Sequence, residues 1–204
     1  MFKISAAVSG LVLLTATAAQ AYPMEFTTSL SGANEVPAVA SAGTGNASVF
    51  YDPTAHTLQV NVTFSGLTGT TTASHIHCCT ALPFQTTLPN APVATQTPTF
   101  PGFPLGVTSG VYNSVTFDLT NATSWNPSFI TAHGGTTAQA EADLAAGLFG
   151  NKSYLNVHSS FAGGGEIRGV LVFVPEPLTL SLFGAGLAGV AALRRRRRTE
   201  NRAA

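Results

Sequence analysis

Apolar and polar residues alternate along much of the chain, and the alternation is clearest over residues 58–65. Single polar residues separate four apolar ones there, at Leu58, Val60, Val62 and Phe64. Successive side chains of a strand point to opposite faces, so this period of two predicts a strand with one buried face. Asp52-Pro53 before it is typical of a turn, which makes residues 47–64 a predicted hairpin.

Five further segments have the composition of strands, and glycines separate several of them: residues 24–30, 74–77, 111–119, 154–159 and 166–174. Short strands with turn residues between them are typical of antiparallel sheets. The body of the chain is therefore predicted to be mainly β, an antiparallel β-sandwich with one short helix. A signal helix before it and a hydrophobic helix after it complete the expected fold.

Two segments of the body interrupt this pattern. Residues 82–106 contain six prolines, which exclude a central strand and favour a long ordered loop or edge segment over the sandwich. Residues 136–149 are rich in alanine, and Thr136 and Gln139 have the spacing of a capping box. We expect a short helix there that packs Leu144 and Leu148 onto the sheet and ends at Gly150.

The first 21 residues have the order of a secretory signal peptide. Lys3 supplies the positive charge, residues 4–14 are mostly apolar, and Ala19 and Ala21 form an A-x-A cleavage site. Cleavage by signal peptidase after Ala21 would leave Tyr22 as the first residue of the exported protein. An uncleaved N-terminal anchor is the alternative interpretation.

The other end of the chain carries a second targeting pattern. Pro175, Glu176 and Pro177 precede an uncharged run over residues 178–193, and five arginines follow at 194–198. A helix of that length spans about 24 Å, close to the ~30 Å of a hydrocarbon core. The arginines should remain cytoplasmic, together with a tail over residues 199–204, and the body should lie outside.

This order of Pro-Glu-Pro, apolar helix and basic cluster resembles the PEP-CTERM sorting signal of Gram-negative bacteria. The resemblance implies recognition and cleavage near Pro175–Pro177 by a membrane protease of the exosortase class. The protein would then be exported across the inner membrane, anchored transiently through residues 178–193, and released to the cell envelope or the extracellular space. A plain single-pass anchor is the alternative.

Removing both signals changes the charge balance, because most basic residues lie within them. The whole chain has a formal net charge of zero, but residues 22–174 hold two basic and seven acidic side chains, a net charge of −5. An acidic surface disfavours binding to nucleic acid or anionic membranes through bulk electrostatics. The 153 residues are sufficient for one domain with its own core.

Three ordered motifs in this body resemble the CHRD domain, a module named after chordin that also occurs in bacterial exported proteins. They are Leu30-Ser-Gly-Ala-Asn-Glu-Val-Pro37, Ser74-His-Ile-His77, and Tyr154-Leu-Asn-Val-His158 followed by Gly165-Glu-Ile-Arg-Gly169. The match covers residues 26–172 and implies an extracellular β-rich module without an established enzymatic activity. The chain departs from the family pattern at Cys78-Cys79 and the proline-rich segment, where a glycine-containing turn is usual.

Histidines in two of these motifs are candidate metal ligands. His75 and His77 are two residues apart on a predicted strand and share a face, and His158 lies on a later strand. If the two strands are neighbours, three imidazoles converge as ligands for copper or zinc. The arrangement resembles copper/zinc superoxide dismutase, although the bridging histidine, zinc-site aspartate and electrostatic loop of that enzyme have no evident counterpart. The alternative is that the histidines donate structural hydrogen bonds to backbone carbonyls.

Cys78 and Cys79 are the two cysteines of the chain, and they are adjacent. Neighbouring Cα atoms are ~3.8 Å apart, below the usual disulfide range of ~4.4–6.8 Å. An oxidising compartment nonetheless permits a vicinal disulfide, which is the interpretation we favour. Ligation of a soft metal beside His77 and an intermolecular cross-link are the alternatives.

Other polar and aromatic residues of the motifs have structural interpretations. Glu166 and Arg168 share a predicted strand face and are expected to form a salt bridge, with Glu166 as an acceptor for a histidine in the alternative. Asn34 and Glu35 are expected to cap a turn before Pro37. The two aromatic residues flanking Pro127 are expected to anchor the core or a loop: Trp125 and Phe129.

The sequence offers no positive argument for an enzyme, because the serine-hydrolase, zinc-protease, phosphate-loop and dinucleotide motifs are all missing. The leading hypothesis is an exported, non-enzymatic CHRD module that binds or contributes structure in the envelope or matrix. Exopolysaccharide and envelope proteins are its candidate partners, by analogy with the sorting signal. The competing hypothesis is a copper- or zinc-binding metalloprotein that uses His75, His77 and His158, with Cys78 or Cys79 as an additional ligand, in copper storage or redox protection.

Overall fold

The alternating segment forms an antiparallel hairpin in the computed structural model, which describes residues 23–83, 90–175, 184–192 and 194–195. β2 (Thr44–Asp52) and β3 (Thr57–Ser65) pair over their whole length. In the turn between them, the Asp52 carboxylate accepts hydrogen bonds from the amides of Thr54 and Ala55. The predicted hairpin is therefore confirmed.

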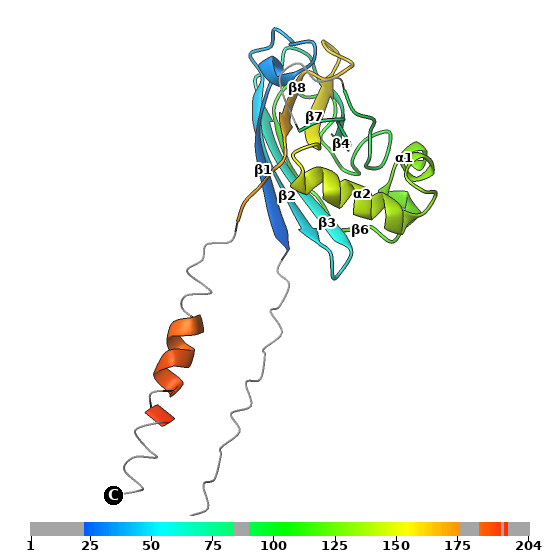
Figure 1. Cartoon of the computed structure of the whole chain (residues 1–204). Helices are drawn as coiled ribbons and strands as arrows, with labels where there is room; N and C mark the ends of the chain where they lie inside the picture. The colour runs from blue at the N-terminus through cyan, green and yellow to red at the C-terminus, as the bar shows by residue number, and fades with distance from the viewer. Residues whose placement is uncertain (1–22, 84–89, 176–183, 193, 196–204) are drawn as a thin grey trace, which may run out of the picture.

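Seven further strands join this hairpin in the described part of the chain. They are β1 (Met24–Ser31), β4 (Thr71–His77), β5 (Gly110–Asn113), β6 (Phe117–Asp118), β7 (Tyr154–Ser159), β8 (Ile167–Val170) and β9 (Val172–Phe173). All belong to one curled antiparallel sheet with the order β4-β7-β8-β1-β2-β3-β5, while β6 pairs with β3 and β9 with β1 (Figure 1). The mainly β, antiparallel prediction is confirmed, and its form is one curled sheet rather than the two separate sheets of a sandwich.

Two of the predicted strands are broken into two short ones. The segment over residues 111–119 becomes β5 and β6, because Ser114 uses its hydroxyl oxygen to accept from Val60 N while its own amide donates to Val60 O. The segment over residues 166–174 becomes β8 and β9, with the amide of Leu171 between them donating to Ser153 O.

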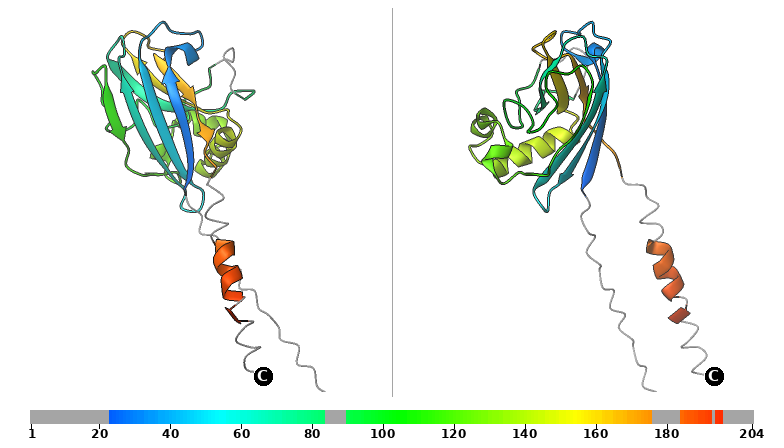
Figure 2. Two further views of the ribbon diagram at one scale, coloured as in Figure 1. Left: turned by 90° about the vertical axis from the view of Figure 1, so that its left-hand side faces the viewer. Right: turned by 180° about the vertical axis from the view of Figure 1, so that it is seen from behind.

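Two α-helices lie on the same side of the sheet, inside its curl (Figures 1 and 2). α2 (Thr137–Phe149) is the predicted helix: Thr136 caps it by accepting from Gln139 N, and Gly150 ends it. α1 (Pro127–Ala132) was not expected, although Asn126 caps it and proline occupies its first position. Short 3-10 turns at Gly32–Asn34 and Ala122–Ser124 complete the helical elements of the described residues between 23 and 175.

The core lies between the inner face of the sheet and α2. The helix contributes Leu144 and Leu148, both almost fully buried, and the ring of Phe149 packs edge-on against Phe26 of β1 at 5.2 Å. Trp125 and Phe129 are also buried and stack on one another, which confirms their expected role as anchors.

The proline-rich segment covers the exposed edge of β4. Ala94 N donates to Ile76 O and Phe100 N donates to Ser74 O, while the hydroxyls of Thr95 and Thr99 accept from the amides of those same two strand residues. The threonine hydroxyls thus accept the hydrogen bonds that the backbone carbonyls of a neighbouring strand would otherwise accept. The edge of β4 is therefore protected from pairing with another chain. The expectation of an ordered edge segment is confirmed for its described residues.

Parts of both targeting segments lie outside the described residues. These are the signal peptide with Ala19 and Ala21, then Glu176, Pro177, residues 178–183, Leu193 and residues 196–204. Residues 184–192 are helical with exposed side chains. No helix within the described residues has the length and apolar character needed to cross a membrane.

Glu166 connects three loops at one end of the sheet. Its carboxylate accepts from the hydroxyls of Ser41 and Ser159 and from the amides of Thr68 and Gly69. Burial raises the pKa of Glu166, but these hydrogen bonds outweigh burial and hold the pKa below its ordinary value. The expected salt bridge with Arg168, and the alternative role beside a histidine, are wrong because these donors take the carboxylate.

Replacement of Glu166 by glutamine should lower the free energy of unfolding by about 3 kcal/mol, because an amide NH₂ would face donors that need an acceptor. Urea denaturation at neutral pH measures the change. Glu25→Gln on β1 is the control, with an expected change under about 0.5 kcal/mol. Equal stability of the two variants would contradict this role.

Candidate metal centre

Pairing between β4 and β7 brings together histidines that are 83 residues apart in the sequence. In the register of these antiparallel strands, His77 lies opposite Tyr154, His75 opposite Asn156, and Ala73 opposite His158. Ile76, between the two β4 histidines, points to the core on the other face. The alternation seen in the sequence therefore places all three histidines on one face.

The three imidazoles form a compact cluster. One ring nitrogen from each of His75, His77 and His158 lies within 4.8 Å of the others. The closest pair is His75 Nδ1 and His158 Nε2, which are 3.2 Å apart. The side chains of His75 and His77 are buried, and His158 is half-buried.

Backbone carbonyls bind the outer nitrogen of every ring. His75 Nε2 is 2.8 Å from Pro98 O, His77 Nδ1 is 2.8 Å from Ala91 O, and His158 Nδ1 is 2.9 Å from Gly163 O. A carbonyl oxygen can only accept, so each of these nitrogens carries a proton. A neutral imidazole has a single N–H, and therefore the inner nitrogen of each ring presents a lone pair to the cluster.

These lone pairs have no donor among the described residues. His75 Nδ1 and His158 Nε2 face one another as acceptors, and His77 Nε2 is buried without a hydrogen-bond partner in the described part of the chain. Either a proton or a metal cation can satisfy such a cluster. Burial, reinforced by the neighbouring imidazoles, lowers the pKa of both His75 and His77 to about 4. Protonation is therefore disfavoured at neutral pH, and a metal cation is the better match.

The distances and the outer contacts fit a transition metal. Two nitrogens bound to one Zn²⁺ at about 2.0–2.1 Å in tetrahedral geometry are about 3.3–3.4 Å apart. The closest pair in the cluster is 3.2 Å apart. Metal-bound histidines regularly donate their other N–H to a carbonyl or carboxylate, as all three rings do here. The residues present therefore fit copper or zinc.

Tyr154 supports His77 through two contacts. Its ring stacks on the imidazole with centroids 4.7 Å apart and an interplanar angle of 9°. Its hydroxyl lies 3.1 Å from Ala91 N and 3.3 Å from Ala91 O, the carbonyl that binds His77. The guanidinium of Arg168 lies over the tyrosine ring, 4.6 Å from its centroid, and Arg168 Nη1 donates to Asn90 Oδ1 at 2.6 Å.

A buried carboxyl and a buried amide lie beside this support. Glu35 Oε2 is 3.7 Å from Arg168 Nε and 3.5 Å from Asn156 Nδ2. Burial raises the pKa of Glu35 to about 7 against the opposing charge of Arg168. Glu35 Oε1 and Asn156 Oδ1 are buried without a partner in the described residues. The backbone amide of Glu35 donates to Gly32 O and caps the Gly32–Asn34 turn as expected, while its side chain belongs to the polar layer around the histidines.

Comparison with known families places this geometry in context. The model of the CHRD domain matches residues 26–171, which include the three histidines, Glu35 and Arg168. The chain belongs to the CHRD family. The PEP-CTERM protein-sorting motif matches residues 173–197, and this motif implies export and processing by an exosortase. Comparison with the curated proteins finds no match, and comparison with the solved structures finds none.

The cysteines of this CHRD domain lie apart from the histidine cluster. Cys78 and Cys79 form a disulfide that packs against α2, where both sulfurs approach the backbone oxygen of Asp143. A disulfide sulfur is not a thiolate, so neither cysteine provides the additional metal ligand considered from the sequence. An intermolecular cross-link is likewise not formed in this state.

Sequence reasoning missed most of what surrounds the histidines. It gave hydrogen bonds to backbone carbonyls as an alternative, which is confirmed, but it did not identify which carbonyls accept them or the roles of Tyr154, Asn156 and Glu35. The signal for two of them was present in the period of two on β7, since Tyr154 and Asn156 share the face of His158. The carbonyl acceptors carry no sequence signal, because every residue has a carbonyl.

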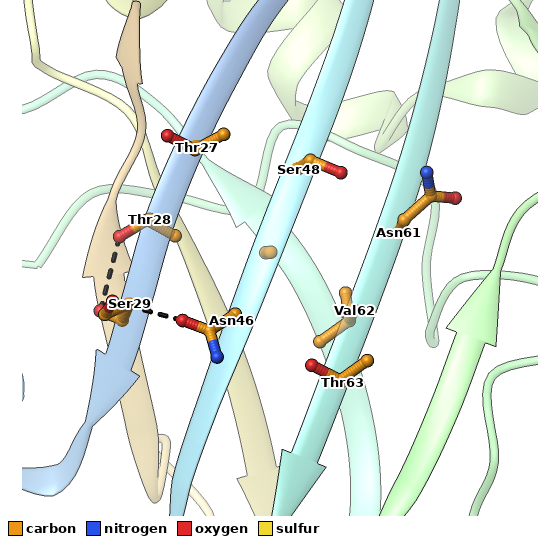
Figure 3. Close-up of a pocket in the computed structure, with 9 residues that line it drawn as sticks. Thr27, Thr28, Ser29, Asn46, Ser48, Asn61, Val62 and Thr63 are labelled. Carbon is orange, nitrogen blue, oxygen red and sulfur yellow. Dashed lines mark hydrogen bonds between the residues drawn. The ribbon is translucent and has the colours of Figure 1, made fainter. Parts of the chain in front are cut away.

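Apart from the histidine cluster, the CHRD domain has a hollow on the outer face of β1, β2 and β3. It is a shallow depression of about 440 Å³ lined by short uncharged side chains, with Thr27, Asn46 and Asn61 among them (Figure 3). The side chains labelled there are hydroxyls, amides and one valine, and a hydrogen bond joins Ser29 to Asn46. This surface holds no titratable group, so acid–base or metal chemistry is more readily assigned to the histidines.

The metal-free domain should lose stability as the pH falls from 7 to 5. In the folded protein, His75 and His77 stay neutral down to about pH 4, whereas histidine in the unfolded chain is protonated below about pH 6.5. Protonation therefore favours the unfolded chain between these two pH values. Each histidine can contribute up to about 1.4 kcal/mol per pH unit. Glu35 acts in the opposite sense, because its raised pKa adds stability as the pH falls below about 7.

The histidine contribution is therefore measured as a difference between proteins. Urea denaturation in the presence of a chelator at pH 7 and pH 5 gives the loss for the wild type and for His75→Gln. The variant should lose less stability over this interval, because its glutamine does not titrate. An identical loss in both proteins would show that His75 is not held neutral in the fold.

Proposed function

We propose that this exported CHRD domain binds one copper or zinc ion through His75, His77 and His158. The observation that carries the proposal is the orientation of the rings: each outer N–H is bound to a carbonyl, so three lone pairs converge. Imidazole nitrogen is a preferred ligand of both metals. The bound ion would connect β4 and β7 to the proline-rich segment and the β7–β8 loop.

The proposed role is binding and structure, without catalysis. Two of the three ligands are buried, at 6% exposure for His75 and 7% for His77, which leaves little room for a substrate to reach a bound ion. Catalysis commonly pairs a histidine with a carboxylate. Among the described residues beside the site, the Glu35 carboxyl contacts Arg168 and Asn156 instead of a histidine. Metal storage or stabilisation suits this enclosure better than redox turnover.

The proposed location is the cell envelope. The PEP-CTERM motif supports export and transient anchoring, followed by exosortase processing. There, the uncharged outer face of β1–β3 offers hydroxyl and amide groups to an exopolysaccharide or an envelope protein.

The exported protein, purified from the periplasm and treated with a chelator, should bind one equivalent of Cu²⁺ or Zn²⁺ at pH 7. Elemental analysis after dialysis measures the stoichiometry. His75→Gln and His77→Gln should each abolish stoichiometric binding, because a buried amide replaces a ligand.

His56→Gln provides the matched control, because His56 pairs with Glu141 away from the cluster and glutamine can still donate to that carboxylate. This variant should keep one ion per chain. A folded wild-type protein without stoichiometric metal would overturn the metal centre and leave an envelope module that acts through its surface alone.

Metal binding should also stabilise the fold. A ligand that binds only the folded state at 100 times its dissociation constant adds about 2.7 kcal/mol to the free energy of unfolding. We expect a rise in Tm on adding Zn²⁺ to the wild type and to His56→Gln, with no rise for His77→Gln. Calorimetric scans with matched metal concentrations test this, and an equal rise in all three proteins would indicate binding elsewhere.

A further inference from the structure

The disulfide that follows β4 opens onto a cavity that the proposed metal centre does not use. The cavity has a volume of about 430 Å³, and Cys79, His133, Asp143 and Lys152 line it. His133 Nδ1 lies 2.7 Å from Asp143 Oδ2 on its wall. The cavity therefore combines a disulfide sulfur with a histidine, a carboxylate and an amine.

The two sulfurs differ in their access to this cavity. Cys78 is 0% exposed and belongs to the core, whereas Cys79 is partly exposed and forms part of the cavity wall. A thiol that enters the cavity from solvent would therefore meet Cys79, while Cys78 lies behind it in the core. The structure thus distinguishes the sulfur that would be attacked from the sulfur that would leave.

The surroundings accommodate both oxidation states. The backbone oxygen of Asp143 lies 3.8 Å from Cys78 Sγ and 3.5 Å from Cys79 Sγ. A disulfide has no S–H to donate, but each thiol of the reduced pair would find this acceptor in place. Gly147 of α2 provides the space, because any side chain at this position would overlap both sulfurs.

We propose that Cys78–Cys79 is a reversible thiol–disulfide exchange site whose substrates are small dithiols. One thiolate of the dithiol attacks Cys79 Sγ, the bond between the two cysteines breaks, and Cys78 leaves as a thiolate that takes a proton. The second thiol of the substrate then attacks the substrate's first sulfur in the mixed disulfide. This step closes a cyclic disulfide in the substrate and releases Cys79 as a thiol. The dithiol loses two electrons and two protons, and the protein gains them.

The side chains of the cavity suit this reaction. Lys152 and the hydrogen-bonded His133–Asp143 pair line the cavity together with Cys79, so an incoming thiol would meet an amine and an imidazole beside the sulfur that it attacks. The proposal is independent of the metal centre, since no histidine of that cluster lines the cavity.

The test uses the full chain without denaturant and dithiothreitol as the dithiol. The disulfide should be reduced while the far-UV circular dichroism spectrum stays folded. Two thiols per chain are then counted with iodoacetamide after transfer to denaturant, and removal of the dithiol under air should restore the disulfide. Reduction that occurs only in denaturant would overturn the proposal and leave a purely structural disulfide.

Single-cysteine variants test the assignment of the attacked sulfur. The free Cys79 of Cys78→Ser should react with iodoacetamide at least about tenfold faster than the free Cys78 of Cys79→Ser, because exposure controls access. Thermal scans establish that both variants are folded. Equal rates, or a faster Cys78, would overturn attack at Cys79.

Discussion

Burial of His75, His77 and Tyr154 between β4, β7 and the segments that cover them restricts their access to water, so their N–H and O–H groups find acceptors within the protein. This requirement fixes the chemistry of the three histidines. Carbonyls of Ala91, Pro98 and Gly163 accept the only N–H of each neutral ring, and the remaining nitrogen of each must turn inward. The hydrogen bonds to the carbonyls are thus present, and the same arrangement leaves the inward nitrogens that would bind metal in the proposed function. The two interpretations open from the sequence therefore do not exclude one another.

The separate motifs of the sequence meet in this one polar layer. The sheet places His75, Asn156 and Arg168 in a single row across β4, β7 and β8, and Asn34 donates its side-chain amide to Arg168 O. Glu35, from the same turn, brings its carboxyl beside the guanidinium. Burying such groups is costly unless they are paired, so removal of one partner leaves its neighbour with an unpaired charge or hydrogen bond. The motifs are far apart in the sequence, but the pairing of β4 with β7 and of β7 with β8 brings their residues together in this layer.

Local patterns were enough to predict the β2–β3 hairpin, the cap and end of α2, and the shared face of His75 and His77, because each depends on residues a few positions apart. The contribution of His158 depended on strand pairing over 83 residues, which alternation alone does not determine. The ion pair assigned to Glu166 failed for a related reason. Sharing a strand face made Arg168 a plausible partner, but three donors from distant loops and the hydroxyl of Ser159 on β7 occupy the carboxylate. Tertiary contacts decide which of several local possibilities a charged side chain adopts.

The end of β4 is held from both sides, and this links the histidine cluster to the proline-rich segment. His77 donates to Ala91 O, and the next residue, Cys78, donates its amide to Pro92 O at 3.0 Å. Side chains alternate at this point, so the imidazole lies in the polar layer while the sulfur of Cys78 packs against α2. Any ligand that fixes the His77 ring also fixes the carbonyl to which it is bound, and the adjacent disulfide anchors the same turn. In the proposed function, a metal ion at the histidines and order in the proline-rich segment would be linked through this hydrogen bond, and each would favour the other.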